Sequence, residues 1–260
     1  MKSRTRFIVT LVCCCVVTFS GITTTQTKVQ ASTTTVSSSS LRGVNVPSIW
    51  YDSLSYSALT AIKKQTFNTV RIVWNTSGTS SRLDQIIAQC VSIGLKPIVE
   101  LHDATGGGDA SSLNTCVNYW VRSDVKAVLS KYNTLWVNIA NEWGPANSTV
   151  WRDGYVNAIS TMRTAGISNV LVIDSGGWGQ DSNDILNYAS SIMSSNSNKN
   201  VMFSIHMYGS WNSNSAIDSF LTSCKNSSIP IMVGEFGYNY NSGNNNLSCS
   251  VDAAHQMKKM

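Results

Sequence analysis

The sequence predicts an α/β fold built on a parallel β-sheet, and three observations point to it. Short runs rich in Val and Ile recur along the chain about every 30 residues, which is the length of a strand–helix–strand unit. The segments between these runs have apolar residues at helical spacing. The runs themselves are apolar almost throughout, as expected for strands that are covered on both faces.

Seven runs are predicted to be strands. They begin near residues 41, 69, 96, 135, 170, 201 and 230 and read LRGVNV, TVRIVW, KPIVELH, LWVNIANE, VLVIDSGG, VMFSIHMY and PIMVGEFG. Between the second and third runs, SRLDQIIAQCVSIG places Leu83, Ile86 and Cys90 on one helical face. This helix is predicted to end at Gly94, because glycine suits the residue after a helix C-terminus. The segment STVWRDGYVNAISTMRTAG is predicted to be a helix that ends in the same way at Gly166.

We predict that these units form a (β/α)8 TIM barrel whose eighth strand is missing from this chain. An open doubly wound sheet is the competing architecture, and it would normally carry a glycine-rich phosphate loop after an early strand. The nearest candidate, ATGGGDA at 104–110, lacks the spacing of such loops, so we interpret it as a flexible active-site loop. A barrel typically needs about 250 residues, whereas about 220 follow residue 40.

Residues 1–31 are predicted to be a secretory signal peptide. Basic residues precede an apolar run over 7–19, which is too short to span a bilayer comfortably, and a Thr-rich stretch follows. Cleavage after Ser20 and cleavage after Ala31 both fit the small residues there. A retained membrane anchor is the alternative interpretation. The signal peptide predicts a secreted, extracellular protein.

Residues 32–40 are expected to be a flexible Ser/Thr-rich leader, and 41–260 the folded domain. Most of the formal net charge of +5 arises before Ser32, where four of the 19 basic residues and no acidic residue lie; the 15 other basic residues face 14 acidic ones. This balance argues against nucleic acid as a partner. No later run is long enough for a membrane helix, so we expect no membrane partner. We also expect a monomer. The many Asn, Ser and Trp residues suit a neutral, hydroxyl-rich ligand.

Polar residues stand at the ends of the predicted strands, where the active sites of barrel enzymes lie. They are Asn45, Arg71, His102, Asp103, Asn141, Glu142, Asp174, His206, Tyr208 and Glu235. Glu142 and Glu235 follow strands 4 and 7, which lie nearly opposite each other in an eight-stranded ring. Glycoside hydrolysis needs such a pair, because one carboxyl group protonates the leaving oxygen while the other attacks the anomeric carbon or activates water.

With these carboxylates, the sequence resembles family 5 of the glycoside hydrolases, and most closely its secreted endo-β-1,4-mannanases. The matching motifs are RGVN (42–45), NTVRIV (68–73), HDATG (102–106), NIANEW (138–143), GWGQ (177–180), MFSIHMY (202–208) and GEFG (234–237). The resemblance implies a retaining endo-β-1,4-mannanase that acts on mannan, glucomannan or galactomannan without a metal or cofactor. A β-1,4-glucanase of the same family is the alternative. The NEW triplet, with HDATG and GWGQ, favours mannan.

The resemblance also implies roles for single residues. Glu142 is expected to be the acid/base and Glu235 the nucleophile, while Asn141 binds the 2-hydroxyl of the sugar being cleaved. Arg71 and Tyr208 are expected to orient the nucleophile and keep it ionised, since a nearby cation lowers the pKa of a carboxyl group. Retention predicts carboxyl groups about 5–5.5 Å apart.

His102 and His206 are expected to bind sugar and to support the acid/base. Trp143 and Trp178 follow strand ends and are expected to be platforms on which sugar rings stack.

The loop after the first strand reads VPSIWY, where the family carries a histidine-rich segment. The family's tryptophan at the end of strand 8 has no counterpart. Three explanations stay open: an incomplete sequence, a non-catalytic mannan-binding relative, and completion of the ring by a second chain.

Four cysteines remain after Cys13–Cys15 leave with the signal peptide, and an even number in a secreted chain suggests two disulfides. The order of the predicted helices favours Cys90–Cys116 and Cys224–Cys249, because each pair falls on neighbouring helices. Sequons for N-glycosylation, which matter in a eukaryotic secretory route, lie at Asn75, Asn147, Asn226 and Asn246.

Overall fold

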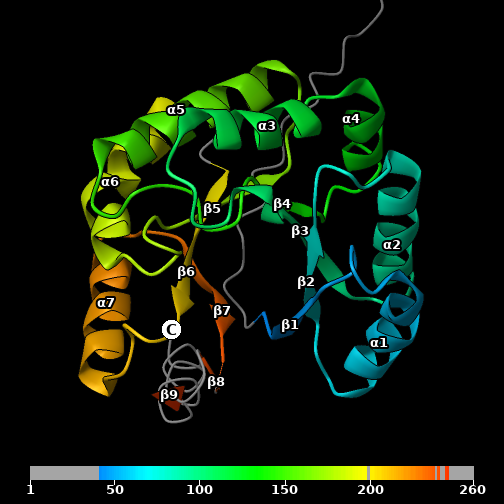
Figure 1. The fold of residues 1–260 in the computed structure, drawn as a ribbon, viewed down its shortest axis with the longest axis horizontal. Coiled ribbons are helices and arrows are strands. Elements are labelled where there is room, and N and C mark those ends of the chain that lie inside the picture. The colour runs from blue at the N-terminus through cyan, green and yellow to red at the C-terminus, as the bar shows by residue number, and fades with distance from the viewer. Residues whose placement is uncertain (1–40, 198–199, 238, 241–243, 246–260) are drawn as a thin grey trace, which may run out of the picture. The chain divides into compact units, whose positions relative to one another are not determined.

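A ring of parallel strands forms the centre of the molecule (Figure 1). The computed structural model describes residues 41–197, 200–237, 239–240 and 244–245. Seven strands form one sheet in which each strand pairs in parallel with the next one along the chain. They are β1 (Gly43–Val46), β2 (Thr69–Trp74), β3 (Lys96–Leu101), β4 (Trp136–Asn138), β5 (Val170–Asp174), β6 (Val201–Met207) and β7 (Ile231–Phe236). The strand predictions and the barrel architecture are confirmed.

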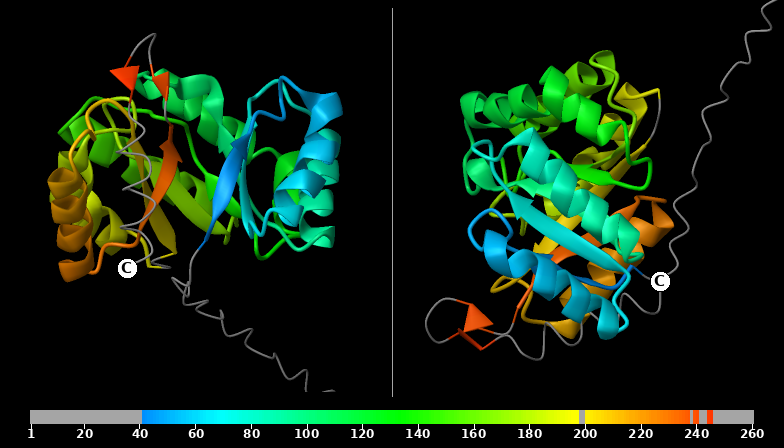
Figure 2. Two further views of the ribbon diagram at one scale, coloured as in Figure 1. Left: turned by 90° about the horizontal axis from the view of Figure 1, so that it is seen from below. Right: turned by 90° about the vertical axis from the view of Figure 1, so that its right-hand side faces the viewer.

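Helices cover the outside of the ring, as the views in Figures 1 and 2 agree. They are α1 (Asp52–Lys64), α2 (Ser80–Ser92), α3 (Ala110–Trp120), α4 (Ser123–Leu129), α5 (Thr149–Thr164), α6 (Ser182–Ser195) and α7 (Asn214–Asn226), with a 3-10 turn, η1, at His102–Ala104. The side chain of Thr79 caps α2, and that of Ser148 caps α5, by accepting a hydrogen bond from a backbone N–H of the first turn. Gly94 and Gly166 adopt positive φ just beyond α2 and α5, as predicted.

The core lies between the ring and the helices. Strands β2, β4, β5 and β6 are buried at every residue, which explains why their sequences are apolar almost throughout. Each helix presents one apolar face to the sheet, such as Leu83, Ile86 and Ile87 of α2. The few charged residues inside these strands therefore need a specific reason to be there.

The ring is open between β1 and β7, which lie on either side of the opening in Figure 2 (left). The described residues contain no eighth barrel strand; the short segments β8 (Asn239–Tyr240) and β9 (Asn244–Asn245) pair only with each other. Strand β7 is accordingly only half-buried for most of its length. One side-chain contact crosses the opening, where Nδ2 of Asn45 donates to the carbonyl oxygen of Gly234 at 3.4 Å.

Several predictions from the sequence concern residues outside the described ranges. They are the signal peptide over 1–31, the leader over 32–40, the sequon at Asn246, and Cys249 with its predicted bond to Cys224. Within the described residues, no helix combines the length and the apolar character that crossing a bilayer requires.

The predicted Cys90–Cys116 disulfide is wrong in this structure, where both residues are free thiols. They do lie on α2 and α3, as predicted, but these helices are not close neighbours: α2 packs against α1 and α4, and α3 packs mainly against α5. Each thiol points into the core beneath its own helix and is fully buried. Burial raises the pKa of both thiols to about 12, so they are poor nucleophiles at neutral pH.

Free thiols at Cys90 and Cys116 make a chemical prediction. Denaturing the protein without a reductant and adding iodoacetamide should alkylate both residues. Peptide mapping by mass spectrometry should find each one modified on its own peptide. Recovery of a Cys90–Cys116 cross-linked peptide from the unreduced sample would contradict the structure.

Candidate active site

Arg71 of β2 stands at the centre of a polar cluster inside the mouth of the ring. Its guanidinium is buried and donates to four side-chain acceptors. The distances are 3.0 Å to Oδ1 of Asn138, 2.7 Å to Oδ1 of Asn141, 3.2 Å to Oδ2 of Asp174 and 2.6 Å to Oε1 of Glu235. Burial favours the neutral form, but the carboxylates of Glu100, Asp174 and Glu235 outweigh it and raise the pKa of Arg71. The cluster therefore contains a permanent buried cation.

Glu235 of β7 is held from three sides. Arg71 donates to Oε1, and the hydroxyl of Tyr208 donates to Oε2 at 2.9 Å. His206 lies on the neighbouring strand, with Nδ1 at 3.8 Å from Oε2. Burial raises the pKa of Glu235, but His206, Arg71 and the Tyr208 hydrogen bond together bring it below its usual range. Glu235 is therefore ionised at neutral pH, and both of its oxygens are held in place.

A change of register places Glu235 beside His206. The β6–β7 ladder pairs Ile205 with Val233 and then His206 with Glu235, so Gly234 is left without a partner. A Cβ atom on residue 234 would lie 2.3 Å from Oγ of Ser204 and 3.0 Å from Nε2 of His206. Glycine is therefore required at this position for Glu235 to approach the ring interior.

Glu142 lies in the loop after β4 and is buried. Its Oε1 lies 2.7 Å from Nδ1 of His206, and its backbone N–H donates to Oδ2 of Asp174 at 3.2 Å. The backbone φ of Glu142 is +49°, which few residues other than glycine adopt and which occurs most often at functional sites.

Burial disfavours a charge on His206, but Asp174 and Glu235 outweigh it and raise its pKa to about 10. His206 is thus a cation at neutral pH and donates its Nδ1 proton to Glu142.

The two carboxylates face each other across a short gap. One oxygen of Glu142, one oxygen of Glu235 and one ring nitrogen of His206 all lie within 4.8 Å of one another. Among the described residues, this is the group whose spacing could also hold a metal ion. However, a protonated imidazole has no free electron pair for a metal, so the site favours proton transfer over metal binding.

The comparisons with known proteins agree with this geometry. The family model for cellulase (glycosyl hydrolase family 5) matches residues 28–260, which is most of the chain. This chain belongs to glycosyl hydrolase family 5. It is a glycoside hydrolase, and the two facing carboxylates are the feature that this chemistry requires.

Relatives in the family are mannanases by name. A mannan endo-1,4-beta-mannosidase of Salipaludibacillus agaradhaerens is 34% identical over 210 residues, which cover 78% of this chain and 68% of the relative. One of Streptomyces lividans is also 34% identical, over 78% of this chain and 55% of the relative. The solved β-mannanase of Thermomonospora fusca is 33% identical with a TM-score of 0.76, covering 84% of this chain and 76% of that one. An endoglucanase of Thermobifida fusca, at 20% identity and a TM-score of 0.64, shares the fold.

His102 and Asn141 line the same mouth. Nδ1 of His102 lies 2.9 Å from Oε1 of Glu100, and its ring meets the ring of Trp50 edge to face at 5.3 Å between centroids. The amide nitrogen of Asn141 donates to Oγ1 of Thr105 at 2.9 Å. The structure thus brings together seven predicted residues: Arg71, His102, Asn141, Glu142, His206, Tyr208 and Glu235.

The prediction that Trp143 is a sugar platform is wrong. Trp143 is 1% exposed, and its indole N–H donates to the carbonyl oxygen of Asp109 at 2.8 Å and to Oγ of Ser112 at 3.1 Å. Its ring packs edge to face against Tyr155 of α5. The left-handed backbone at Glu142 reverses the chain here, so Trp143 turns into the core while Glu142 turns into the mouth.

Trp178, unlike Trp143, is exposed. It is 59% exposed in the loop after β5, and its ring lies against Gly106 of the loop after β3. A Cβ atom on Gly106 would come within 2.6 Å of this ring. Trp178 itself has a φ of +60°, a second strained backbone among the predicted site residues.

Sequence reasoning missed one residue of the cluster, Glu100, and one aromatic residue beside His102, Trp50. Glu100 is a charged residue inside the apolar run KPIVELH, the same signal that identified Arg71. Asp174 was recognised at the end of its strand but received no role. Trp50 is 55% exposed beside His102, and only its contact with that ring reveals its place.

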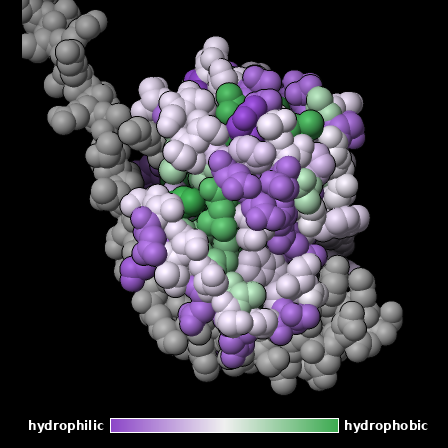
Figure 3. Space-filling view, turned by 90° about the vertical axis from the view of Figure 1, so that its left-hand side faces the viewer, coloured by the Kyte–Doolittle hydropathy of each residue, from purple (hydrophilic) through white to green (hydrophobic). Residues whose placement is uncertain are grey.

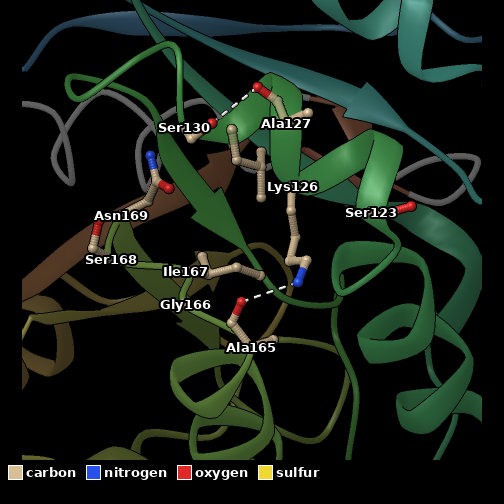
Figure 4. A pocket seen from close by; sticks show the side chains of 10 residues that line it. Ser123, Lys126, Ala127, Ser130, Ala165, Gly166, Ile167, Ser168 and Asn169 are labelled. Atoms are coloured by element: carbon tan, nitrogen blue, oxygen red, sulfur yellow. Dashed lines mark hydrogen bonds between the residues drawn. The ribbon is translucent and has the colours of Figure 1, made fainter. Parts of the chain in front are cut away.

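A cavity outside the polar cluster lies at the other end of the barrel. It has a volume of about 380 Å³ and is formed by α4 and the turn between α5 and β5 (Figure 4). There Nζ of Lys126 donates to the carbonyl oxygen of Ala165 at 3.1 Å, at the C-terminal end of α5. This turn leads into the first residue of β5, so the cavity is at the end of the barrel opposite the carboxylates. On the side formed by α6 and α7, Figure 3 shows small hydrophobic areas scattered among hydrophilic and neutral residues.

The charge on His206 predicts how stability depends on pH. The pKa of His206 rises from an ordinary 6.5 to about 10 on folding, so between these values the folded protein holds a proton that the unfolded chain releases. The free energy of unfolding should therefore fall as the pH rises through this range, by up to about 1.4 kcal/mol per unit. Urea unfolding of the wild type and of His206→Gln from pH 6 to pH 10 measures the difference. Equal slopes for the two proteins would contradict a raised pKa.

Proposed function

We propose that this family 5 hydrolase is a retaining endo-β-1,4-mannanase that cleaves internal bonds of mannan, glucomannan and galactomannan. The observation that carries the proposal is the pair of Glu142 and Glu235, with oxygens within 4.8 Å and with different neighbours. This is the close spacing expected of a retaining enzyme, rather than the wider spacing that leaves room for a water. The mannan specificity is supported by relatives named as mannanases.

In the first step, ionised Glu235 attacks the anomeric carbon while Glu142 donates a proton to the leaving glycosidic oxygen. The bond between the anomeric carbon and that oxygen breaks, and an ester bond forms between the sugar and Glu235. Arg71 and Tyr208 keep Glu235 ionised and aimed until this moment. In the second step, Glu142, now ionised, takes a proton from water, and the resulting hydroxide displaces Glu235.

Neighbouring residues would position the substrate. Asn141 is turned by Arg71 and Thr105 so that its amide can meet the hydroxyl next to the anomeric carbon. The exposed ring of Trp178 offers a flat apolar face against which a sugar ring stacks. Solved structures of the Thermomonospora fusca β-mannanase include complexes with mannotriose and mannohexaose, which supports an extended oligosaccharide as the ligand.

Secretion belongs to the same proposal, because an enzyme that degrades a polysaccharide must meet it outside the cell. Residues 1–31 supply the signal, and the sequons at Asn147 and Asn226 lie at exposed positions where a glycan could attach. N-terminal sequencing and glycosidase treatment of the protein recovered from the medium test both points; a protein retained in cells with its N-terminus intact would refute secretion.

Both glutamates should be essential. Glu142→Gln and Glu235→Gln should each lower the rate of hydrolysis of glucomannan by about a thousandfold or more, because each step loses its proton donor or its nucleophile. Asp218→Asn, which removes an exposed carboxylate of α7, is the matched control and should be fully active. Reducing-sugar release gives the rates, and proton NMR should find the β-anomer as the first product.

Three outcomes would change the proposal. Cleavage of carboxymethylcellulose in preference to mannan would favour the β-1,4-glucanase. Binding to mannan without hydrolysis would favour the non-catalytic relative. A first product with the α-configuration would refute retention.

Trp178 and Trp143 should respond differently to substitution. Trp178→Ala should raise KM for mannohexaose about tenfold without lowering the melting temperature, since it removes only an exposed stacking face. Trp178→Phe, which keeps an aromatic face, should lose much less. Trp143→Phe should instead destabilise the protein by about 1–3 kcal/mol, because the acceptors at Asp109 and Ser112 lose their donor. Unchanged KM in Trp178→Ala would rule out the platform.

A further inference from the structure

Glu100 is a buried carboxylate for which the mechanism above has no use. It lies on β3 among apolar residues and is fully buried. Oε1 lies 2.9 Å from Nδ1 of His102 and 3.9 Å from Nη1 of Arg71. Oε2 has no hydrogen-bond partner among the described residues. A buried carboxylate with one unpartnered oxygen is costly, so a purely structural role would be served better by glutamine or an apolar residue.

The contact between Glu100 and His102 determines which hydrogen bonds the imidazole can make. Because Nδ1 is engaged by Glu100, Nε2 is the ring nitrogen that is left for a substrate. A neutral His102 with its proton on Nδ1 would present Nε2 as an acceptor, and a protonated His102 would present it as a donor. Partial exposure of His102 at the mouth, beside Trp50, leaves the ring accessible to a ligand.

The surrounding charges favour the protonated ring. Burial lowers the pKa of His102, but the hydrogen bond and charge of Glu100, with a smaller contribution from Glu235 of β7, outweigh it and raise the pKa; Arg71 of β2 opposes them.

Burial raises the pKa of Glu100 itself, and Arg71 and His102 only partly offset it. The other titratable groups that face Glu100 are Asp174 of β5 and the Cys116 thiol of α3. The pKa values of both Glu100 and His102 are thus raised, and the two groups share one proton across their hydrogen bond.

We propose that Glu100 is a positioning residue that fixes the His102 ring through Nδ1 and keeps Nε2 protonated, so that His102 donates a hydrogen bond to a hydroxyl group of the bound polysaccharide. The proposal rests on the proposed function for the identity of the ligand. The state of the His102 ring, however, can be measured in the free protein. Glu100 acts only through His102 and touches no reacting atom.

The first experiment observes the ring directly. The chain has three histidines, so ring signals of protein labelled at histidine can be assigned with a His102→Gln variant and followed by NMR against pH. In the wild type, His102 should titrate above its ordinary value of 6.5. In Glu100→Gln, which keeps the shape and an acceptor but loses the charge, the midpoint should fall by about one unit or more. Asp103→Asn is the matched control: its carboxylate bonds Thr76 instead of His102, and its loss should leave the midpoint unchanged.

The second experiment links the ring to the substrate. Near neutral pH, Glu100→Gln should raise KM for mannohexaose about tenfold, as expected for loss of a hydrogen bond to a charged donor, and should change kcat much less. The alkaline limb of its kcat/KM profile should move to lower pH along with the NMR midpoint. His102→Gln should raise KM similarly, and the double variant should be no worse than either single variant, because both changes remove the same interaction.

Each outcome decides the question. A wild-type midpoint for His102 at or below 6.5 would overturn the proposal without any variant, as would an unchanged midpoint in Glu100→Gln or additive effects in the double variant. If the wild type does not act on mannan but the midpoints behave as expected, the proposed function fails while the Glu100–His102 pair stands. If Glu100→Gln does not fold, the wild-type titration and the His102→Gln kinetics still test the proposal.

Discussion

The buried guanidinium of Arg71 is the interaction on which the rest of the site depends. It joins β2 to side chains of β4, β5 and β7 and to the loop after β4, and all three nitrogens of its planar fork take part. Because arginine does not lose its proton in proteins, its charge must be balanced inside the ring. Removing one partner from such a cluster leaves a buried charge without compensation, which costs about 3–5 kcal/mol. Arg71 therefore ties the stability of the barrel mouth to the arrangement of the carboxylates.

The charge balance of the cluster explains why histidines accompany the acids. Glu100, Asp174, Glu142 and Glu235 bring four carboxyl groups into a space with one obligatory cation. Burial alone would raise the pKa of Asp174, but His206 and Arg71 hold it well below the usual range. His206 takes up a proton for the same reason. The site thus holds Glu235 ionised and His206 protonated.

The parts of this structure that repeat were predictable from the sequence. Seven apolar runs at regular spacing specify strands, and the C-terminal ends of those strands meet at the shared mouth of the ring. The same reasoning failed for Trp143. The left-handed backbone at Glu142 turns the next side chain, Trp143, into the core instead of the mouth. No pattern in the sequence indicates this left-handed conformation.

The disulfide prediction failed for a related reason. The sequence places Cys90 and Cys116 on consecutive helices, but it does not show that α4 lies beside α2 or that both thiols face the sheet. Glu100 was missed although its signal, a charge inside an apolar strand, was the one that identified Arg71. The difference is that Arg71 belongs to a known motif, whereas the role of Glu100 follows only from the 2.9 Å contact with His102.

Glu235 lies on β7, an edge strand of the described sheet. In the described residues β7 pairs only with β6, its residues are half-buried, and its register shifts one residue before Glu235. Backbone hydrogen bonds alone would leave such an edge strand free to move. The side chain is instead fixed from inside the ring, by Arg71 on one oxygen and Tyr208 on the other. These contacts also lower its pKa, so the interactions that position the carboxylate are those that keep it ionised. A substitution that weakens these contacts should therefore change both the position and the ionisation of the Glu235 carboxylate. The two effects cannot be separated by substituting Arg71, as they can be by substituting Glu100.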